Sequence, residues 1–314
     1  MMRSPILFLV FNRPDTTKRV FDAIRAARPP RLYIAADGPR PDRAGEAELC
    51  ESARRIASNV DWPCEVRTLL RSENLGCKRA VSSAVTWFFE CEPEGIVLED
   101  DCLPHHSFFE YCDELLERYR DNPHVMCISG DNFISADWVP SASYYFSRYM
   151  HIWGWASWRR AWRYYDVDMS DWKDNRTNAQ FWARCISHAP QSIGYWQNIF
   201  DKVFSGQLDT WDYQWTYACF KQQGLSCMPG NNLISNIGFG KNATHTTSPE
   251  GKLADLAAVP IAMPLKHPES VEAADIADTL TNDHVFEIGN MNWTFARIRR
   301  AINNRIGWLW GNGG

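Results

Sequence analysis

Short apolar runs alternate with amphipathic segments through the first 130 residues, and this alternation restricts the fold more than any other feature of the chain. The expected strands cover Ile6–Phe11, Arg31–Ala36, Cys64–Leu70, Gly95–Leu98 and His124–Ser129. The expected helices cover Asp15–Ala27, Ala44–Ser58, Cys77–Glu90 and Ser107–Tyr119. Strands and helices in this order require right-handed crossovers. The sequence therefore predicts an α/β fold with a mainly parallel central sheet flanked by helices, as in Rossmann-like proteins.

Charge and cysteine usage exclude several classes of protein. The chain has 314 residues and a net charge of −5, with 33 basic and 38 acidic residues. Nucleic-acid-coating surfaces need an excess of Lys and Arg, so we expect no nucleic-acid partner. The ten cysteines are spaced singly, without a CxxC pair, which favours free thiols in a reducing compartment over a zinc site or a disulfide framework.

No segment has the length of a membrane span. The apolar run Pro5–Phe11 is shorter than a signal peptide or transmembrane helix, and no other run approaches about 20 uninterrupted apolar residues. We therefore expect a cytoplasmic protein. Near the C-terminus, residues 292–310 carry an apolar stripe beside four arginines. Such a helix either docks on the domain or lies on the inner face of an anionic membrane as a peripheral contact.

Three polar clusters follow the ends of expected strands, at Asn12-Arg13, Asp37-Gly38 and Glu99-Asp100-Asp101. Ligands of open α/β sheets bind outside the carboxyl ends of the strands, so these clusters indicate a site. Adjacent carboxylates raise one another's pKa. A divalent cation such as Mn²⁺ or Mg²⁺ bound with a diphosphate, or the hydroxyls of a sugar, would relieve that repulsion. The alternative is a solvated acidic turn.

Five blocks of sequence carry a resemblance to a known family. They are PILFLVFNRP (5–14), AADGPR (35–40), ENLGCKRAV (73–81), GIVLEDDCLPHHSFFEY (95–111), and a longer stretch with IWGWASWRRAW (152–162), WDYQW (211–215) and ISNIGFGKNATH (234–245). In this order they resemble nucleotide-sugar glycosyltransferases of the GT-A fold, and in layout the inverting N-acetylglucosaminyltransferase I family, here as a bacterial cytoplasmic relative.

The resemblance implies roles for residues in the first half of the chain. Residues implied to bind the donor nucleotide, its phosphates or its sugar are Phe11, Asn12, Arg13, Asp37, Asn74, Gly76, Lys78, Arg79, Glu99 and Asp100. Asp101 would be the direct ligand of Mn²⁺ or Mg²⁺, with His245 as a further ligand and Lys241 as a phosphate contact. A nucleotide-diphosphate sugar is the implied donor, and a UDP-sugar is favoured.

The resemblance implies that the Trp-Asp pair of WDYQW, in the last block, supplies the catalytic base. The resemblance assigns that role to Asp212, and Asp209 is the alternative. A carboxylate is required to take the proton of the acceptor hydroxyl as its oxygen attacks the anomeric carbon. The purely structural interpretation of either residue is an N-cap for a helix over Tyr213–Lys221.

The second half of the chain is rich in tryptophan, with ten of the fifteen between Trp138 and Trp215. Sugars stack on aromatic rings, so Trp153, Trp155, Trp158 and Trp211 are the expected walls of a pocket for a carbohydrate-containing acceptor. We expect one catalytic domain over residues 1–247, with a nucleotide-sugar half (1–130) and an aromatic-rich acceptor half (131–247), followed by a C-terminal extension (248–314).

The sequence thus predicts a metal-dependent, inverting glycosyltransferase for bacterial surface polysaccharide or glycan assembly. Two alternatives stay open: a sugar nucleotidyltransferase, and a non-catalytic carbohydrate-binding or scaffold protein of the same fold. Nucleotidyltransferases usually carry a glycine-rich basic loop after the first strand, and Asn12–Thr17 has no glycine.

Overall fold

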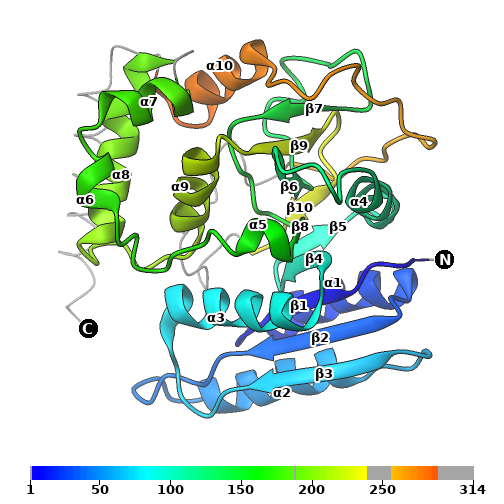
Figure 1. Ribbon diagram of the computed structural model, residues 1–314. Coiled ribbons are helices and arrows are strands. Elements are labelled where there is room, and N and C mark those ends of the chain that lie inside the picture. The colour runs from blue at the N-terminus through cyan, green and yellow to red at the C-terminus, as the bar shows by residue number, and fades with distance from the viewer. Residues whose placement is uncertain (1, 187–188, 239–255, 289–314) are drawn as a thin grey trace, which may run out of the picture.

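An eight-stranded mixed sheet organises the molecule in the computed structural model, which describes residues 2–186, 189–238 and 256–288 (Figure 1). The strand order is β3-β2-β1-β4-β8-β6-β9-β7. The first four strands are parallel to one another: β1 (Ile6–Val10), β2 (Arg31–Ala36), β3 (Glu65–Leu70) and β4 (Glu94–Glu99). They are connected by the helices α1 (Pro14–Ala27), α2 (Glu46–Ser58) and α3 (Gly76–Cys91). The predicted α/β fold with a mainly parallel, helix-flanked sheet is confirmed.

The second half of the chain completes the sheet. Strand β8 (Trp155–Trp158) lies antiparallel between β4 and β6 (Val125–Ser129). Strand β9 (Leu225–Pro229) is parallel to β6, and β7 (Tyr144–Ser147) is the antiparallel edge. A separate two-stranded ribbon pairs β5 (Cys102–Pro104) with β10 (Ile234–Asn236). The ribbon begins where β4 ends, so it brings residues after 234 beside the acidic triplet.

Burial on both faces explains why the first strand is a continuous apolar run. Ile6, Phe8 and Val10 pack into one cluster with α1, α2 and the helix α4 (Ser107–Arg118), whereas Leu7 and Leu9 pack into another with α3. Full burial of such a side chain contributes about 1.5–3 kcal/mol. Figure 1 shows α3 in front of the sheet and α1 and α2 behind it. The two helical layers hold the carboxyl ends of β1, β2 and β4 at one rim.

A group of helices packs beside the sheet and buries many of the tryptophan side chains. It contains α6 (Trp172–Asn175), α7 (Ala179–Ile186), a 3₁₀ turn (Pro190–Ser192), α8 (Ile193–Phe204) and α9 (Asp212–Gln222). Trp172, Trp182 and Trp196 share an aromatic cluster with Phe200. The short α5 (Arg159–Trp162) follows β8 directly and packs on the α3 side of the sheet. Strand β8 and helix α9 therefore bring the aromatic second half of the chain against residues 1–130.

The described part of the C-terminal extension lies against the second half of the sheet. Val259 N donates to the Asn232 carbonyl at 2.8 Å, and helix α10 (Asp275–His284) places Asp278 within 2.6 Å of the Ser147 hydroxyl. The expected helix over 292–310 lies outside the described residues, as do Lys241 and His245. Among the described residues, no helix is both long and apolar enough to cross a membrane.

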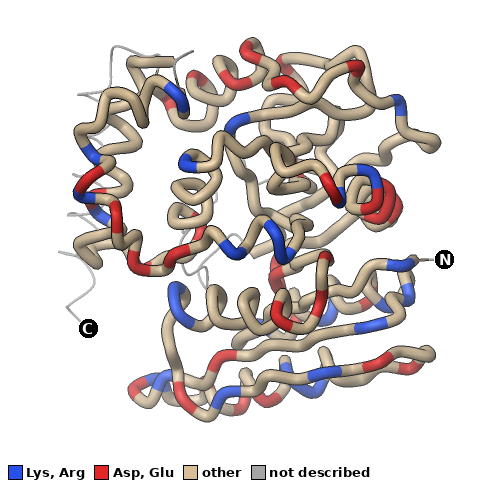
Figure 2. Tube along the Cα trace, viewed as in Figure 1, with Lys and Arg blue, Asp and Glu red and all other residues tan. Residues whose placement is uncertain are grey.

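Basic and acidic residues are interspersed along the described chain, as the blue and red segments of Figure 2 show.

All ten cysteines are free thiols, and seven of them are buried.

Candidate active site

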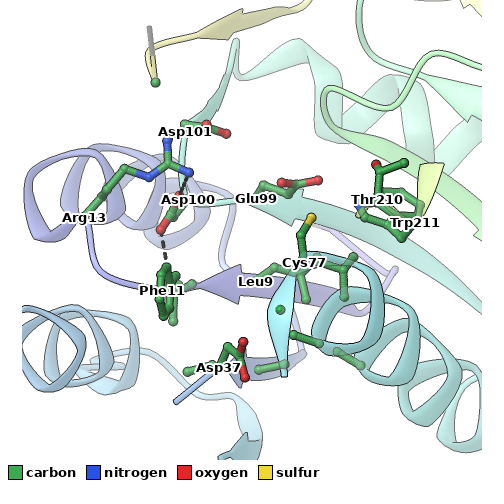
Figure 3. A pocket seen from close by; sticks show the side chains of 18 of the residues that line it. Leu9, Phe11, Arg13, Asp37, Cys77, Glu99, Asp100, Asp101, Thr210 and Trp211 are labelled. Atoms are coloured by element: carbon green, nitrogen blue, oxygen red, sulfur yellow. Dashed lines mark hydrogen bonds and ion pairs between the residues drawn. The ribbon is translucent and has the colours of Figure 1, made fainter. Parts of the chain in front are cut away.

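A cleft of about 560 Å³ opens at the carboxyl ends of β1, β2 and β4. This volume lies within the range of about 300–1,000 Å³ that small-molecule sites occupy. Figure 3 shows side chains from these strand ends, from the start of α3 and from the segment before α9 facing the same space. The predicted site residues that line the cleft are Phe11, Arg13, Asp37, Asn74, Gly76, Glu99, Asp100, Asp101, Trp153, Trp211 and Asp212.

The guanidinium of Arg13 joins two members of the acidic triplet. Its Nη1 donates to Asp101 Oδ2 at 2.7 Å, and its Nη2 lies 3.1 Å from Asp100 Oδ1 (Figure 3). The second Asp100 oxygen accepts the backbone N–H of Phe11 at 3.1 Å. Asp100 is therefore held from both sides, and it fixes the end of β1 against the end of β4. Burial lowers the pKa of Arg13, but the charges of Asp100 and Asp101 outweigh that effect and raise it.

Glu99 lies among other carboxylates at the end of β4. Burial, together with the negative charges of Asp101 and Asp100, raises the pKa of Glu99. The charge of Asp212, which lines the same cleft, adds to that shift. Burial also raises the pKa of Asp100, and the Arg13 guanidinium opposes that rise. Carboxylates concentrated in a cleft with such shifts indicate a site that takes a positive or proton-donating group.

Asp37 and Asn74 connect the end of β2 to the start of α3 through hydrogen bonds. Asp37 accepts the backbone N–H groups of Gly38 and Leu75 at 3.0 Å each, and Asn74 Nδ2 donates to Asp37 Oδ2 at 3.0 Å. A Cβ at Gly38 would lie 2.4 Å from the Glu73 carbonyl carbon, so only glycine permits this backbone approach. Burial raises the pKa of Asp37, and the surrounding backbone N–H groups oppose the shift. These hydrogen bonds fix the wall of the cleft that is formed by the residues after β2.

Asp212 stands on the opposite wall, at the first residue of α9. The Thr210 hydroxyl donates a short hydrogen bond to Asp212 Oδ1, and Gln214 Nε2 donates to the Thr210 carbonyl at 2.7 Å. Asp209, the alternative base, lies beside the start of α3, since a Cβ at Gly76 would be 3.0 Å from its Oδ2. Both carboxylates line the cleft, and only Asp212 has its side chain fixed by the Thr210 hydroxyl.

Several predicted site residues do not line the cleft. Asn12 donates to Glu46 at 2.8 Å on the α2 side, and Lys78 lies 4.0 Å from Asp168. Arg79 is exposed on α3. Asn12 is thus engaged by Glu46, Lys78 lies near a carboxylate of the second half of the chain, and Arg79 is exposed.

Two of the four expected tryptophan walls lie in the core. Trp155 is fully buried between Trp162, Trp211 and Trp215, and Trp158 is 1% exposed with its indole N–H donating to the Leu116 carbonyl. The reason is that Trp155–Trp158 forms the central strand β8, which is buried along its whole length. A third expected wall, Trp211, lines the cleft but is only 2% exposed and stacks on Trp155, so Trp153 is the half-buried aromatic wall that remains.

Sequence reasoning missed two arginines and a thiol in the cleft. Arg40 lies over the Phe11 ring at 5.6 Å and pairs with Glu46, and Arg71 Nη2 donates to the Ser83 hydroxyl at 2.7 Å. Arg40 stands inside the AADGPR block, which could have indicated it; Arg71 had no local signal. Cys77 has a pKa raised by burial and then by the charges of Glu99, Asp212 and Asp209, so its thiol stays protonated.

A further pair of titratable groups lies buried near Trp153. Asp131 and His151 are 3.9 Å apart, and none of their side-chain polar atoms has a hydrogen-bond partner among the described residues. Phe133 stacks on His151 and meets Trp153 edge-on. Burial raises the pKa of Asp131 well above its usual range and lowers that of His151 to about 4. Both groups are therefore neutral in the folded protein over a range where they would be charged in water.

We expect Asp131 to reduce the stability of the folded protein as pH rises above about 4, whereas His151, which is protonated only in the unfolded chain between about pH 4 and 6.5, increases stability over that narrower range. The unfolded chain releases the Asp131 proton near the ordinary pKa, whereas the folded chain retains it, so higher pH favours unfolding. Asp131→Asn is neutral at every pH and should flatten the fall in melting temperature between pH 5 and 8. The exposed Asp42→Asn is the control. Equal pH slopes for Asp131→Asn and the wild type would contradict the assignment.

Asp100 and Asp101 are the candidate ligands for a divalent cation in the cleft. Both carboxylates contact the same cationic group, Asp101 through Nη1 and Asp100 through Nη2 of the Arg13 guanidinium. Mg²⁺ and Mn²⁺ are commonly held by one or two carboxylates, with phosphates and waters completing the coordination. Within residues 2–186, 189–238 and 256–288, no three or more His, Cys, Asp or Glu side chains form a group that could hold a metal ion.

No protein-family model matches the chain, and a search of curated proteins found no match. Among solved structures, HddC from Yersinia pseudotuberculosis is 11% identical with a TM-score of 0.31, over 50% of this chain and 77% of that one. Mouse xyloside xylosyltransferase 1, in its apo form, is 10% identical with a TM-score of 0.32, over 69% of this chain and 81% of that one. Likeness at this level assigns neither fold nor activity. The site itself has to support any function.

Proposed function

We propose that the protein is an inverting glycosyltransferase of the GT-A type, which moves a sugar from a nucleotide-diphosphate sugar to an acceptor hydroxyl with the help of Mn²⁺ or Mg²⁺. The observation that carries the proposal is one cleft at the carboxyl end of an α/β sheet with the triplet Glu99-Asp100-Asp101 on one wall and Asp212 on the other. The wall with the acidic triplet suits a cation and a diphosphate, and the wall with Asp212 suits a catalytic base.

The nucleotide end of the donor fits the rim formed by β1 and β2. Phe11 offers a ring, with Arg40 over it, and Asp37 and Asn74 offer polar groups beside it. Arg13 and Arg71 add positive charge for the diphosphate, since guanidinium groups bind phosphate through paired hydrogen bonds. A UDP-sugar is the donor that we favour.

Asp101 is the direct ligand in this proposal, with Asp100 next to it. When bound, the divalent cation would neutralise the nucleoside diphosphate as it leaves. His245, the second ligand implied by the sequence, lies outside the described residues.

Asp212 takes the proton in the transfer step. The acceptor oxygen forms a bond to the anomeric carbon from one face, the bond from that carbon to the diphosphate oxygen breaks on the other face, and the hydroxyl proton passes to the Asp212 carboxylate. Thr210 orients that carboxylate through its hydroxyl. The product has the inverted anomeric configuration.

The acceptor is carbohydrate-containing in this proposal, because Trp153 supplies an aromatic wall in the cleft that Asp212 also lines. A glycan, a glycolipid or a protein-linked glycan of a bacterial surface-polysaccharide or glycan pathway, assembled on the cytoplasmic side, is the class that we favour.

A panel of UDP-, GDP- and dTDP-sugars tests the function. With Mn²⁺ present, we expect one of them to raise the melting temperature by several degrees and to release nucleoside diphosphate when acceptor is added. EDTA should abolish the release. No shift and no release with any sugar would refute the proposal, and pyrophosphate release from a sugar phosphate and a nucleoside triphosphate would indicate nucleotidyl transfer instead. A shift without turnover of any acceptor would favour the non-catalytic alternative.

A further inference from the structure

The Arg13 side chain occupies the point where the Asp100 and Asp101 carboxylates converge. Separate nitrogens of the guanidinium reach them, Nη1 to Asp101 at 2.7 Å and Nη2 to Asp100 at 3.1 Å. The side chains of Asp100 and Asp101 are only 4% and 14% exposed, so water screens these charges weakly. One positive side chain therefore neutralises much of the charge that would otherwise attract a divalent cation.

The position is crowded as well as charged. The Gly238 backbone covers the ion pair, because a Cβ there would lie 2.2 Å from Asp101 Oδ2 and 2.6 Å from Arg13 Nη1. The Ile237 N–H donates to the Asp101 carbonyl at 2.8 Å, which holds this segment beside the triplet. A second cation cannot enter next to Asp101 Oδ2 while the guanidinium is there.

Arg13 is fixed through its backbone at the start of α1, and its side chain is held at its tip by two ion pairs. Its carbonyl accepts the backbone N–H of Thr17 at 3.0 Å and the Thr17 hydroxyl at 2.7 Å, which fixes its backbone at the start of α1. Its Nε is buried and has no hydrogen-bond partner among the described residues, so the contacts that the guanidinium makes are those of its two terminal nitrogens. Rotation of the side chain would free both carboxylates at once without disturbing the helix.

We propose that Arg13 is an internal counter-ion that competes with the divalent cation for Asp100 and Asp101. The inference rests on the proposed function only in taking Mn²⁺ or Mg²⁺ as the cation. In the empty cleft Arg13 suppresses the mutual repulsion of the two carboxylates. When the cation binds, the guanidinium leaves them and turns to the donor diphosphate, for which it has the matching donor geometry. Donor and cation consequently bind with positive coupling, since each favours the same position of Arg13.

Binding of Mn²⁺ alone, with no nucleotide present, tests the competition. We would measure the affinity by the electron paramagnetic resonance signal of free Mn²⁺ and by calorimetry. Arg13→Gln should bind Mn²⁺ roughly tenfold more tightly than the wild type, because a like charge a few ångströms from the metal is removed. Arg13→Lys keeps the charge and should stay within about threefold of the wild type. Asp101→Asn should lose most of the binding.

Arg40→Gln is the matched control. It removes the same charge from the same cleft, but Arg40 pairs with Glu46 and not with the triplet. We expect its Mn²⁺ affinity to change less than about twofold. Circular dichroism establishes whether each variant is folded. If Arg13→Gln does not fold, the competition is tested with Arg13→Lys, which keeps the charge and should therefore bind Mn²⁺ as the wild type does.

Unchanged or weaker Mn²⁺ binding by Arg13→Gln would overturn the inference, and so would an equal gain in Arg40→Gln. If no variant binds Mn²⁺ while a nucleotide sugar still stabilises the protein, the counter-ion inference fails and the transferase proposal stands in a metal-free form. If Arg13→Gln binds Mn²⁺ more tightly but no nucleotide sugar binds any variant, the transferase proposal fails and the competition stands.

Discussion

Asp212→Asn should lower turnover by about 10²- to 10⁴-fold while donor binding stays close to that of the wild type. The amide has nearly the same shape as the carboxylate and can still interact with the Thr210 hydroxyl, but it cannot accept the proton of the acceptor. Steady-state kinetics with the active nucleotide sugar measure the loss in kcat, and calorimetry of donor binding shows whether the cleft is intact.

Asp209→Asn is the comparison that assigns the base. Asp209 is three residues away and lines the same cleft, beside Gly76. If Asp212 is the base, Asp209→Asn should keep turnover within about tenfold of the wild type. Thr210→Val, which removes the hydroxyl that orients Asp212, should give an intermediate loss in kcat. Full activity of Asp212→Asn, or a larger loss in Asp209→Asn, would move the role to Asp209.

Trp155→Ala should destabilise the protein by about 3–5 kcal/mol, the largest stability effect that we expect for a single aromatic side chain. Trp155 is fully buried and its ring lies 5.6 Å from Trp211, in a stacked arrangement, and 6.0 Å from Trp215. Truncation leaves a cavity in the strand that joins β4 to β6. Urea unfolding followed by circular dichroism measures the change, and Trp155→Phe should restore part of the loss.

Trp153→Ala separates the two kinds of tryptophan. Trp153 stands two residues before Trp155 but lines the cleft. We expect a smaller cost in stability and a rise in KM for the acceptor, with the KM for the donor unchanged. If both variants lost similar stability and the acceptor KM did not change, Trp153 would have only a packing role, as Trp155 does.

The sequence was sufficient for the first half of the fold because β1, β2 and β4 are buried on both faces, whereas β3 is the exposed edge strand. An apolar run such as Ile6–Val10 or Arg31–Ala36 has few alternatives, and its ends are marked by turn residues. Strand β8 escaped prediction because WASW carries no strand signal beyond its tryptophans, and those were interpreted as sugar contacts. Burial of Trp155 and Trp158 follows from the pairing of β8 with both β4 and β6, and nothing local encodes that pairing.

The candidate site was likewise predictable from the sequence only in part. Strand-end polarity brought Arg13, Asp37 and the acidic triplet to one rim, as expected for parallel strands. The contact between Arg13 and Asp101 was not predictable, since 88 positions separate the two residues. The same holds for Arg71, whose side chain reaches the cleft from the segment after β3. Residue type and strand order indicate where a site lies, whereas pairing between side chains depends on packing.

The place of β8 in the sheet also affects the order in which the protein can mature on the ribosome. Strand β4 ends at Glu99, but its partner on the second side is Trp155–Trp158. At about 5–20 residues per second, the open edge of β4 waits on the order of several seconds for that partner to be synthesised. Until then the nascent chain offers the unpaired edge of β4, with its apolar run Ile96–Leu98, next to the unfinished acidic cleft, and such an edge is a template for wrong pairing. A chaperone that shields this edge during synthesis would therefore have most effect on yield, and a fragment ending near residue 130 should be recovered mainly as aggregate.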